Sequence, residues 1–203
     1  MNNMNMTNKF RVAIMAVPER EQIMKVITDE LDKHNVPYDI FMDYDHNGVK
    51  WNFNRILETY CNGNYDEHII ISNDDLIFKD GYFDKANEVM DKTDYKVLSM
   101  FTNQNSKPND ICNIRKATSP YFYYEVGAIF RKGTLNPEFL KEFREWENSP
   151  ERCIKETNHP DNMVSTFLFN HSDKYKCGTV RPNYIALQDV PSTLGHKIVR
   201  KDN

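Results

Sequence analysis

The chain has 203 residues and a formal net charge of -4, with 26 Lys and Arg residues interspersed among 30 Asp and Glu residues. This balance argues against a generally basic nucleic-acid binder, although it allows a local basic groove, and no apolar run approaches the ~20 residues of a membrane span. The length suits one domain, and we expect a soluble, cytoplasmic protein.

The N-terminal segment is largely polar and rich in Asn, without the apolar core of a signal peptide or a membrane anchor. We expect residues 1–9 to form a disordered tail and residues 10–203 to form a single domain. The cysteines are widely separated and contain no Cys-x-x-Cys pair, which argues against a zinc knuckle and favours reduced thiols: Cys61, Cys112, Cys153 and Cys177.

Strand and helix patterns alternate through the first half of the chain. Residues 10–17 are almost continuously apolar, as expected for a strand buried on both faces of a parallel sheet, and Pro18 then opens a helix. Further strands are expected at 38–42, 69–72 and 96–101. The intervening helices are indicated by apolar residues at helical spacing: Ile23, Val26, Ile27 and Leu31; Phe53, Ile56, Leu57 and Tyr60; Phe83, Ala86, Val89 and Met90. This order predicts an α/β fold with a mixed, mostly parallel central sheet flanked by helices.

The pattern changes after Phe101. Residues 102–120 are polar and too numerous for a tight connection, so we interpret them as a mobile or ligand-binding loop. A strand is expected over 121–130 and a helix around Phe139, Phe143 and Trp146. A second helix is expected to begin near His159, and a last strand to run over 184–187.

Two adjacent carboxylates, Asp74 and Asp75, follow the third expected strand directly. Neighbouring acids repel one another, and burial raises their pKa values unless a cation or hydrogen-bond donors keep them ionised. The segment Asn73-Asp74-Asp75 fits the Asp-x-Asp pattern, in which carboxylates hold Mn²⁺ or Mg²⁺ while the metal holds the phosphates of a nucleotide. The alternative is a solvated turn, because Asn and Asp readily bond their own backbone.

Polar residues also follow the first two strands. The first strand leads into Val17-Pro18-Glu19-Arg20 and the second into Asp43-Tyr44-Asp45, with Gly48 and Arg55 beyond it. Open sheets of this kind bind ligands beyond the carboxyl ends of their strands, so these residues are candidates to hold a nucleotide. Guanidinium groups suit phosphate, which favours Arg20 and Arg55. The alternative is a charged surface turn.

Three further side chains have two interpretations each. For Trp51 we favour packing in the core over stacking on a base, because aromatic residues dominate cores. Asp161 stands at an expected helix start, where an acid serves either as an ordinary helix cap or as a general base that deprotonates an acceptor hydroxyl in an inverting reaction. His159 is the second choice for that base.

Taken together, these residues resemble the GT-A (Rossmann-like) glycosyltransferases, particularly the small stand-alone enzymes of bacteriophages. The match runs through residues 12–20, 43–55, 69–76 and 125–130 to Asp161-Asn162, and so covers most of the chain. The resemblance implies a nucleotide-sugar donor, with a UDP-sugar as the first choice, and Mn²⁺ or Mg²⁺ at the Asp-x-Asp motif. It also implies a nucleotide-sugar-binding half at 10–101 and an acceptor-binding half at 102–203.

The resemblance assigns roles to individual residues. The implied donor contacts are Val17, Pro18, Arg20, Asp43, Asp45, Gly48, Trp51, Arg55, Asn73 and Asp74. The implied acceptor contacts are Tyr124, Glu125, Gly127 and His159, with Asp161 as the catalytic base. The implied acceptor is a hydroxyl on a modified base in phage DNA or on a glycan, and a phage protein of this kind would act in the cytoplasm of the host.

The metal ligands are implied less directly, because the chain departs from the family pattern. Asn73 stands at the first Asp-x-Asp position, which makes Asp75 the better metal ligand and Asp74 a ribose or sugar contact, with the opposite assignment as the alternative. Asp189 stands where relatives often have a His before Ser-Thr, and His196 follows it closely. Either side chain is a suitable third ligand for Mn²⁺ or Mg²⁺.

Two other functions are compatible with the same pattern. A nucleotidyltransferase needs a loop rich in Gly and in Lys or Arg after the first strand, and residues 16–19 lack one. A non-catalytic module that binds a nucleotide or a glycan at a degenerate site is the second alternative. Asn73 and Asp189, the two departures from the family pattern, favour it.

Overall fold

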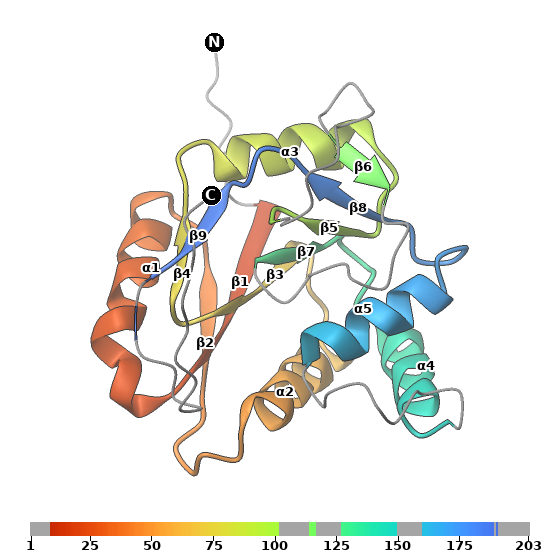
Figure 1. The fold of residues 1–203 in the computed structure, drawn as a ribbon, viewed down its shortest axis with the longest axis horizontal. Helices are drawn as coiled ribbons and strands as arrows, with labels where there is room; N and C mark the ends of the chain where they lie inside the picture. The colour runs from red at the N-terminus through yellow and green to blue at the C-terminus, as the bar shows by residue number, and fades with distance from the viewer. Residues whose placement is uncertain (1–8, 102–113, 117–126, 150–159, 189, 191–203) are drawn as a thin grey trace.

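The computed structural model describes residues 9–101, 114–116, 127–149, 160–188 and 190 (Figure 1). The strands are β1 (Phe10–Ala16), β2 (Tyr38–Met42), β3 (His68–Asn73), β4 (Leu76–Phe78), β5 (Val97–Ser99), β6 (Ile114–Lys116), β7 (Ala128–Phe130), β8 (Cys177–Val180) and β9 (Ile185–Leu187). The helices are the 3₁₀ helix η2 (Pro18–Arg20) and the α-helices α1 (Glu21–Lys33), α2 (Val49–Asn62), α3 (Tyr82–Lys92), α4 (Pro137–Glu147) and α5 (Pro160–Asn170).

Within the described residues, seven strands form one sheet in the order β2-β1-β3-β7-β5-β8-β6 (Figure 1). The pairs β1–β2, β1–β3 and β5–β8 are parallel, whereas β3–β7, β5–β7 and β6–β8 are antiparallel. Strands β1, β2, β3, β5 and β8 therefore point the same way, and β7 and β6 point the opposite way. The prediction of a single α/β domain with a mixed, mostly parallel sheet and flanking helices is confirmed.

The side chains of β1 divide between two cores, one on each face of the sheet. Val12 and Ile14 belong to a core with residues of α1 and α3. Ala13 and Met15 belong to the other core, which contains residues of α2, α4 and α5. Burial on both faces explains why β1 is almost continuously apolar. It also places α1 and α2 on opposite sides of the same strand.

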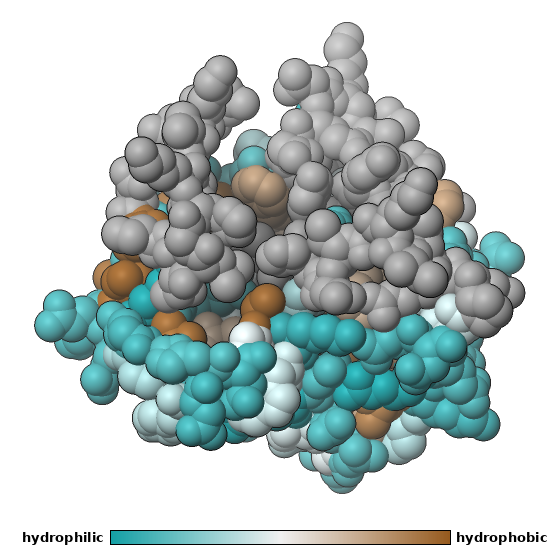
Figure 2. All heavy atoms as spheres, turned by 60° about the horizontal axis from the view of Figure 1, so that its bottom comes forward, coloured by the Kyte–Doolittle hydropathy of each residue, from teal (hydrophilic) through white to brown (hydrophobic). Residues whose placement is uncertain are grey.

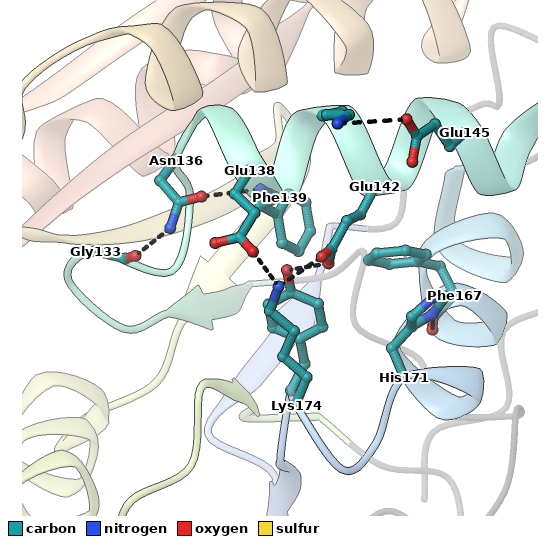
Figure 3. A network of polar contacts seen from close by, with 11 residues as sticks. Gly133, Asn136, Glu138, Phe139, Glu142, Glu145, Phe167, His171 and Lys174 are labelled. Carbon is teal, nitrogen blue, oxygen red and sulfur yellow. Dashed lines mark hydrogen bonds and ion pairs between the residues drawn. The ribbon is translucent and has the colours of Figure 1, made fainter.

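Helices α4 and α5 are held together by rings and by one lysine (Figure 3). Phe139 and Phe167 meet edge to face at 5.5 Å between ring centroids, a favoured geometry for aromatic pairs. Lys174, just after α5, lies 2.8 Å from a carboxylate oxygen of Glu138 and 2.6 Å from one of Glu142 on α4. These contacts fix α5, and with it the helix turn that contains Asp161, against the domain.

Several elements differ from the sequence-based expectation. Residues 18–20 form the 3₁₀ helix η2, so the first α-helix begins only at Glu21. A short strand, β6, occurs at 114–116 within the stretch expected to be a loop, because it pairs with β8, itself an unexpected strand. The last expected strand, as β9, pairs with β4 in a separate two-stranded sheet. Three-residue strands carry no periodic signal, so only their partners define them.

The ends of the expected elements also shift. The fourth strand is shorter than expected and spans only Val97–Ser99. The expected N-terminal tail lies outside the described residues except for Lys9, whose ammonium group lies 3.1 Å from the Asp91 carboxylate. The expected strand over 121–130 is described only in its last part, where β7 begins at Ala128. In the described part of the chain, no helix is long and apolar enough to cross a membrane.

The turn before β7 generates a test of backbone strain. Gly127 has φ +63° and a Cβ there would lie 3.1 Å from Leu76 Cδ1, whereas Gly133 has φ +76° and a Cβ there would meet nothing within 4 Å. We expect Gly133→Ala to lower the free energy of unfolding by about 1 kcal/mol, because alanine is strained in the left-handed region. Gly127→Ala should lower it by about 2–3 kcal/mol, because it adds a steric clash to the same backbone strain. Denaturant unfolding measures both losses. Equal losses would contradict this account.

Candidate functional site at the carboxyl edge of the sheet

The carboxyl ends of β1, β2 and β3 meet at one edge of the sheet. In the parallel pairing, Ala16 lies opposite Met42 and Met15 opposite Asn73, and the Asp43 N–H donates to the Ala16 carbonyl at 2.9 Å. The chain moves from β1 to β2 on one side and then crosses to β3 on the other, so the strand order reverses at β1. Open α/β sheets bind ligands at such a reversal. Figure 2 turns the lower side of Figure 1 toward the viewer, and the described side chains in view there are mainly hydrophilic with some hydrophobic ones among them.

Asp74 and Asp75 are buried at this edge, with exposed fractions of 4% and 5%. The Arg20 Nη1 atom lies 3.0 Å from Asp74 Oδ1 and 3.8 Å from Asp75 Oδ2. Burial raises the pKa of Asp74, and the hydrogen bond from Arg20 opposes that shift only in part. The alternative of a solvated turn is therefore wrong, because the two acids lie in a buried turn beside a guanidinium.

Asp43 is buried as well, but hydrogen-bond donors of its own loop surround it. Its Oδ1 accepts from the Asn47 backbone N–H at 3.0 Å and from the Asn47 amide at 3.2 Å, and its Oδ2 accepts from the Gly48 N–H at 2.8 Å. Burial alone would raise the pKa of Asp43, but these bonds hold it below the ordinary value. Asp43 thus shapes the loop between β2 and α2. Sequence reasoning missed Asn47, although the pair Asn47-Gly48 is a known turn signal.

Gly48 and Arg55 complete this loop. Gly48 precedes α2 with φ +99°, a conformation that essentially only glycine adopts. Arg55 donates to the Met42 carbonyl at 2.9 Å and lies 4.6 Å from the ring centroid of Trp51. Trp51 is 40% exposed, so the core packing that we favoured for it is wrong. Its ring covers Arg55 at the surface instead.

The segment before Asp189 reaches the buried acids. β9 pairs with β4, and the Gln188 N–H then donates to the Asp75 carbonyl at 2.7 Å. The Gln188 amide also donates to the Ile23 carbonyl at 3.0 Å, which ties this segment to α1. Asp189 and His196 themselves lie outside the described residues. Gln188 is a second residue that sequence reasoning missed, because its role depends on a pairing distant in the chain.

The described residues fit a divalent cation only with help from a ligand. No group of three or more His, Cys, Asp or Glu side chains in the described ranges is arranged to hold a metal. Adjacent Asp74 and Asp75 nevertheless match the way Mg²⁺ is commonly held, by one or two carboxylates together with substrate phosphates. The residues present are therefore compatible with a metal that arrives with a phosphorylated ligand.

Some of the remaining candidate residues lie within the described ranges and others lie outside them. Val17 precedes η2 and accepts the Arg20 N–H at 3.0 Å, and Asp45 lies exposed in the loop after β2. Gly127 is buried, and its carbonyl accepts the Tyr82 hydroxyl at 3.0 Å. The backbone of Asp161 lies in the first turn of α5, and its side chain is not among the described parts of the structure. Tyr124, Glu125 and His159 lie outside the described residues.

Comparison with known proteins adds no relative. No protein-family model matches the chain, and the search of curated proteins gives no match. The geometry of the site is therefore the basis for assigning a function.

The hydrogen bonds to Asp43 generate a prediction about pH. Because the folded pKa lies below the ordinary value of about 3.9, the carboxylate stabilises the fold above that value, and this contribution is lost as the pH falls through the folded pKa. We expect Asp43→Asn to cost about 1–3 kcal/mol at pH 7, because the N–H donors lose a charged acceptor. The difference in the free energy of unfolding between the variant and the wild type should become smaller below about pH 4.

Urea unfolding of both proteins across the pH range measures that difference. Asp45→Asn is the matched control, because Asp45 is an exposed acid in the same loop. A difference that stays constant between neutral pH and the acid limit would contradict the role given to the Asp43 carboxylate.

Proposed function

We propose that the protein is a glycosyltransferase of the GT-A type that moves a sugar from a nucleotide-sugar donor to an acceptor hydroxyl. The observation that carries the proposal is the meeting of Arg20 with buried Asp74 and Asp75 where the strand order reverses. Crevices at this position hold nucleotides in other open sheets. Paired acids beside a guanidinium suit a ligand that brings both phosphate and a divalent cation.

On the donor side, two arginines and one aromatic ring provide the contacts. Arg20 at the end of η2 and Arg55 on α2 supply guanidinium groups for the diphosphate. The exposed part of the Trp51 ring, backed by Arg55, offers a stacking surface to the base of the donor. Asp43 maintains the conformation of the loop that joins β2 to α2, the helix that carries Trp51 and Arg55. A UDP-sugar is the first donor to test.

The metal requirement follows from the leaving group. Asp75 would hold Mn²⁺ or Mg²⁺, with Asp189 or His196 as a further protein ligand. A divalent cation at this position would stabilise the negative charge that develops on the departing nucleoside diphosphate. Asp74, bonded to Arg20, would hold the guanidinium next to the position of the same phosphates until they bind.

On the acceptor side, Asp161 is the proposed base. It lies in the first turn of α5, whose Met163 and Val164 pack in the same core as α2. In an inverting reaction its carboxylate would take the proton of the acceptor hydroxyl as the new glycosidic bond forms. His159 is the second choice for this role. The proposed acceptor is a modified base in phage DNA or a glycan, and the proposed compartment is the cytoplasm.

The two alternatives make different predictions about the same site. A nucleotidyltransferase would hold a triphosphate in a loop after β1, but residues 18–20 form a single 3₁₀ turn with one basic side chain, Arg20. A non-catalytic module would bind a nucleotide or a glycan without turnover. Transfer of a sugar to any acceptor separates the proposed function from both.

Metal-coupled nucleotide binding is the first test. A ligand at 100 times its dissociation constant should add about 2.7 kcal/mol of apparent stability. We expect a nucleoside diphosphate, with UDP tested first, to raise the melting temperature more in the presence of Mn²⁺ than in its absence. A panel of nucleoside diphosphates measured by thermal shift checks this. Absence of a metal-dependent shift with every nucleotide would refute the proposed function.

Two substitutions separate the donor site from the base. Asp75→Ala should abolish the Mn²⁺-dependent part of nucleotide binding, because it removes the proposed metal ligand. Asp161→Ala should leave that binding intact and remove sugar transfer, with a loss on the order of 10²–10⁴-fold expected for a general base. Mass spectrometry of acceptors incubated with a panel of donors measures transfer. Transfer retained by Asp161→Ala would contradict its assignment as the base.

A further inference from the structure

In the described part of the chain, Arg20 is the cation that forms ion pairs with the buried acids Asp74 and Asp75. Its side chain is 13% exposed, and the side chains of Asp74 and Asp75 are 6% and 7% exposed, so water screens these charges little. One nitrogen, Nη1, lies within 3.0 Å of Asp74 and 3.8 Å of Asp75. The backbone of Arg20 is held by its N–H bond to the Val17 carbonyl at 3.0 Å. When a ligand rearranges this site, the guanidinium group of Arg20 is therefore the part that moves.

We propose that Arg20 couples the binding of the divalent cation to the binding of the diphosphate. The guanidinium and the cation require the same two carboxylates. Two positive charges held next to the same acids repel each other strongly where solvent screening is weak. The cation alone therefore binds poorly while Arg20 stays on the acids. This inference rests on the proposed function, because it takes the ligand to be a nucleoside diphosphate.

A diphosphate relieves the competition in two ways at once. Its oxygens accept the guanidinium in a charge-assisted, forked geometry, which draws Arg20 away from Asp74 and Asp75. The same group supplies oxygen ligands to the cation on the vacated carboxylates. Thermodynamic linkage requires that the cation then improves diphosphate binding by the same factor. The cation and the nucleotide should enter and leave together, with Arg20 exchanging partners each time.

Binding of Mn²⁺ without any nucleotide tests the competition directly. Electron paramagnetic resonance of free Mn²⁺ gives the affinity of the wild type and of Arg20→Gln. We expect the variant to bind Mn²⁺ at least about fivefold more tightly, the lower end of typical coupling between sites. Arg131→Gln is the matched control, because Arg131 is a partly buried arginine that follows β7 at the opposite edge of the sheet and donates to the Tyr95 and Thr93 carbonyls. That control should leave the Mn²⁺ affinity near the wild-type value.

A second pair of variants protects the test from misfolding. Arg20→Gln leaves two buried acids without their guanidinium, which could unfold the protein. In Asp74→Asn, one of the two negative charges is already absent, so adding Arg20→Gln to it removes the remaining positive charge while Asp75 stays. The double variant should again bind Mn²⁺ more tightly than Asp74→Asn alone. If neither comparison shows tighter binding, the proposed competition is overturned.

Addition of UDP, and of pyrophosphate as a base-free diphosphate, tests the coupling. In the wild type, either ligand should raise the Mn²⁺ affinity of the protein by about fivefold or more, and Arg20→Gln should lose most of that increase. A gain that Arg20→Gln retains in full would overturn the coupling and leave the proposed transferase standing. Tighter Mn²⁺ binding by Arg20→Gln without any diphosphate effect would keep the competition and refute the nucleotide site.

Discussion

The parallel pairing of β1 with both β2 and β3 is the constraint on which the rest of the site depends. β1 is buried on both faces, and its two neighbours leave the sheet at the same edge. The loops that follow these three strands therefore lie side by side. Because α1 and α2 pack on opposite faces, the chain leaves β1 and β2 toward opposite sides of the sheet, the arrangement at which open α/β sheets bind ligands.

The three carboxylates at this edge are handled in two different ways. Asp43 is surrounded by N–H donors from its own loop, and its pKa is lowered despite burial. Asp74 accepts hydrogen bonds from the Arg20 guanidinium and from the Val17 backbone, both in another loop, and its pKa is raised because burial outweighs these bonds. Asp43 is thus satisfied locally and holds the loop in shape. Asp74 and Asp75 are buried next to each other, which makes them the acids that a further cation would stabilise.

Helices α4 and α5 are held by a cluster of contacts of their own. The aromatic rings of α4 and α5 form one face of the core, and Lys174 and Tyr175 both bond Glu142 on α4 (Figure 3). This arrangement fixes the C-terminal part of α5 without contributing residues to the buried acid pair. In the proposed function, the buried acid pair and the catalytic base therefore come from different parts of the fold, which are joined by the core that α2 shares with α4 and α5.

The sequence by itself determined the elements that have a strong local signal. The apolar run at 10–17 predicted β1, the helical spacing predicted α1 to α5, and the acids after β3 predicted a polar strand end, because each pattern depends on residues adjacent in the chain. Only the tertiary structure decided the partners. It placed β7 antiparallel between β3 and β5, paired β9 with β4, exposed Trp51 and joined Arg20 to Asp74 across 54 positions. Such pairings depend on the approach of distant segments, which local periodicity does not encode.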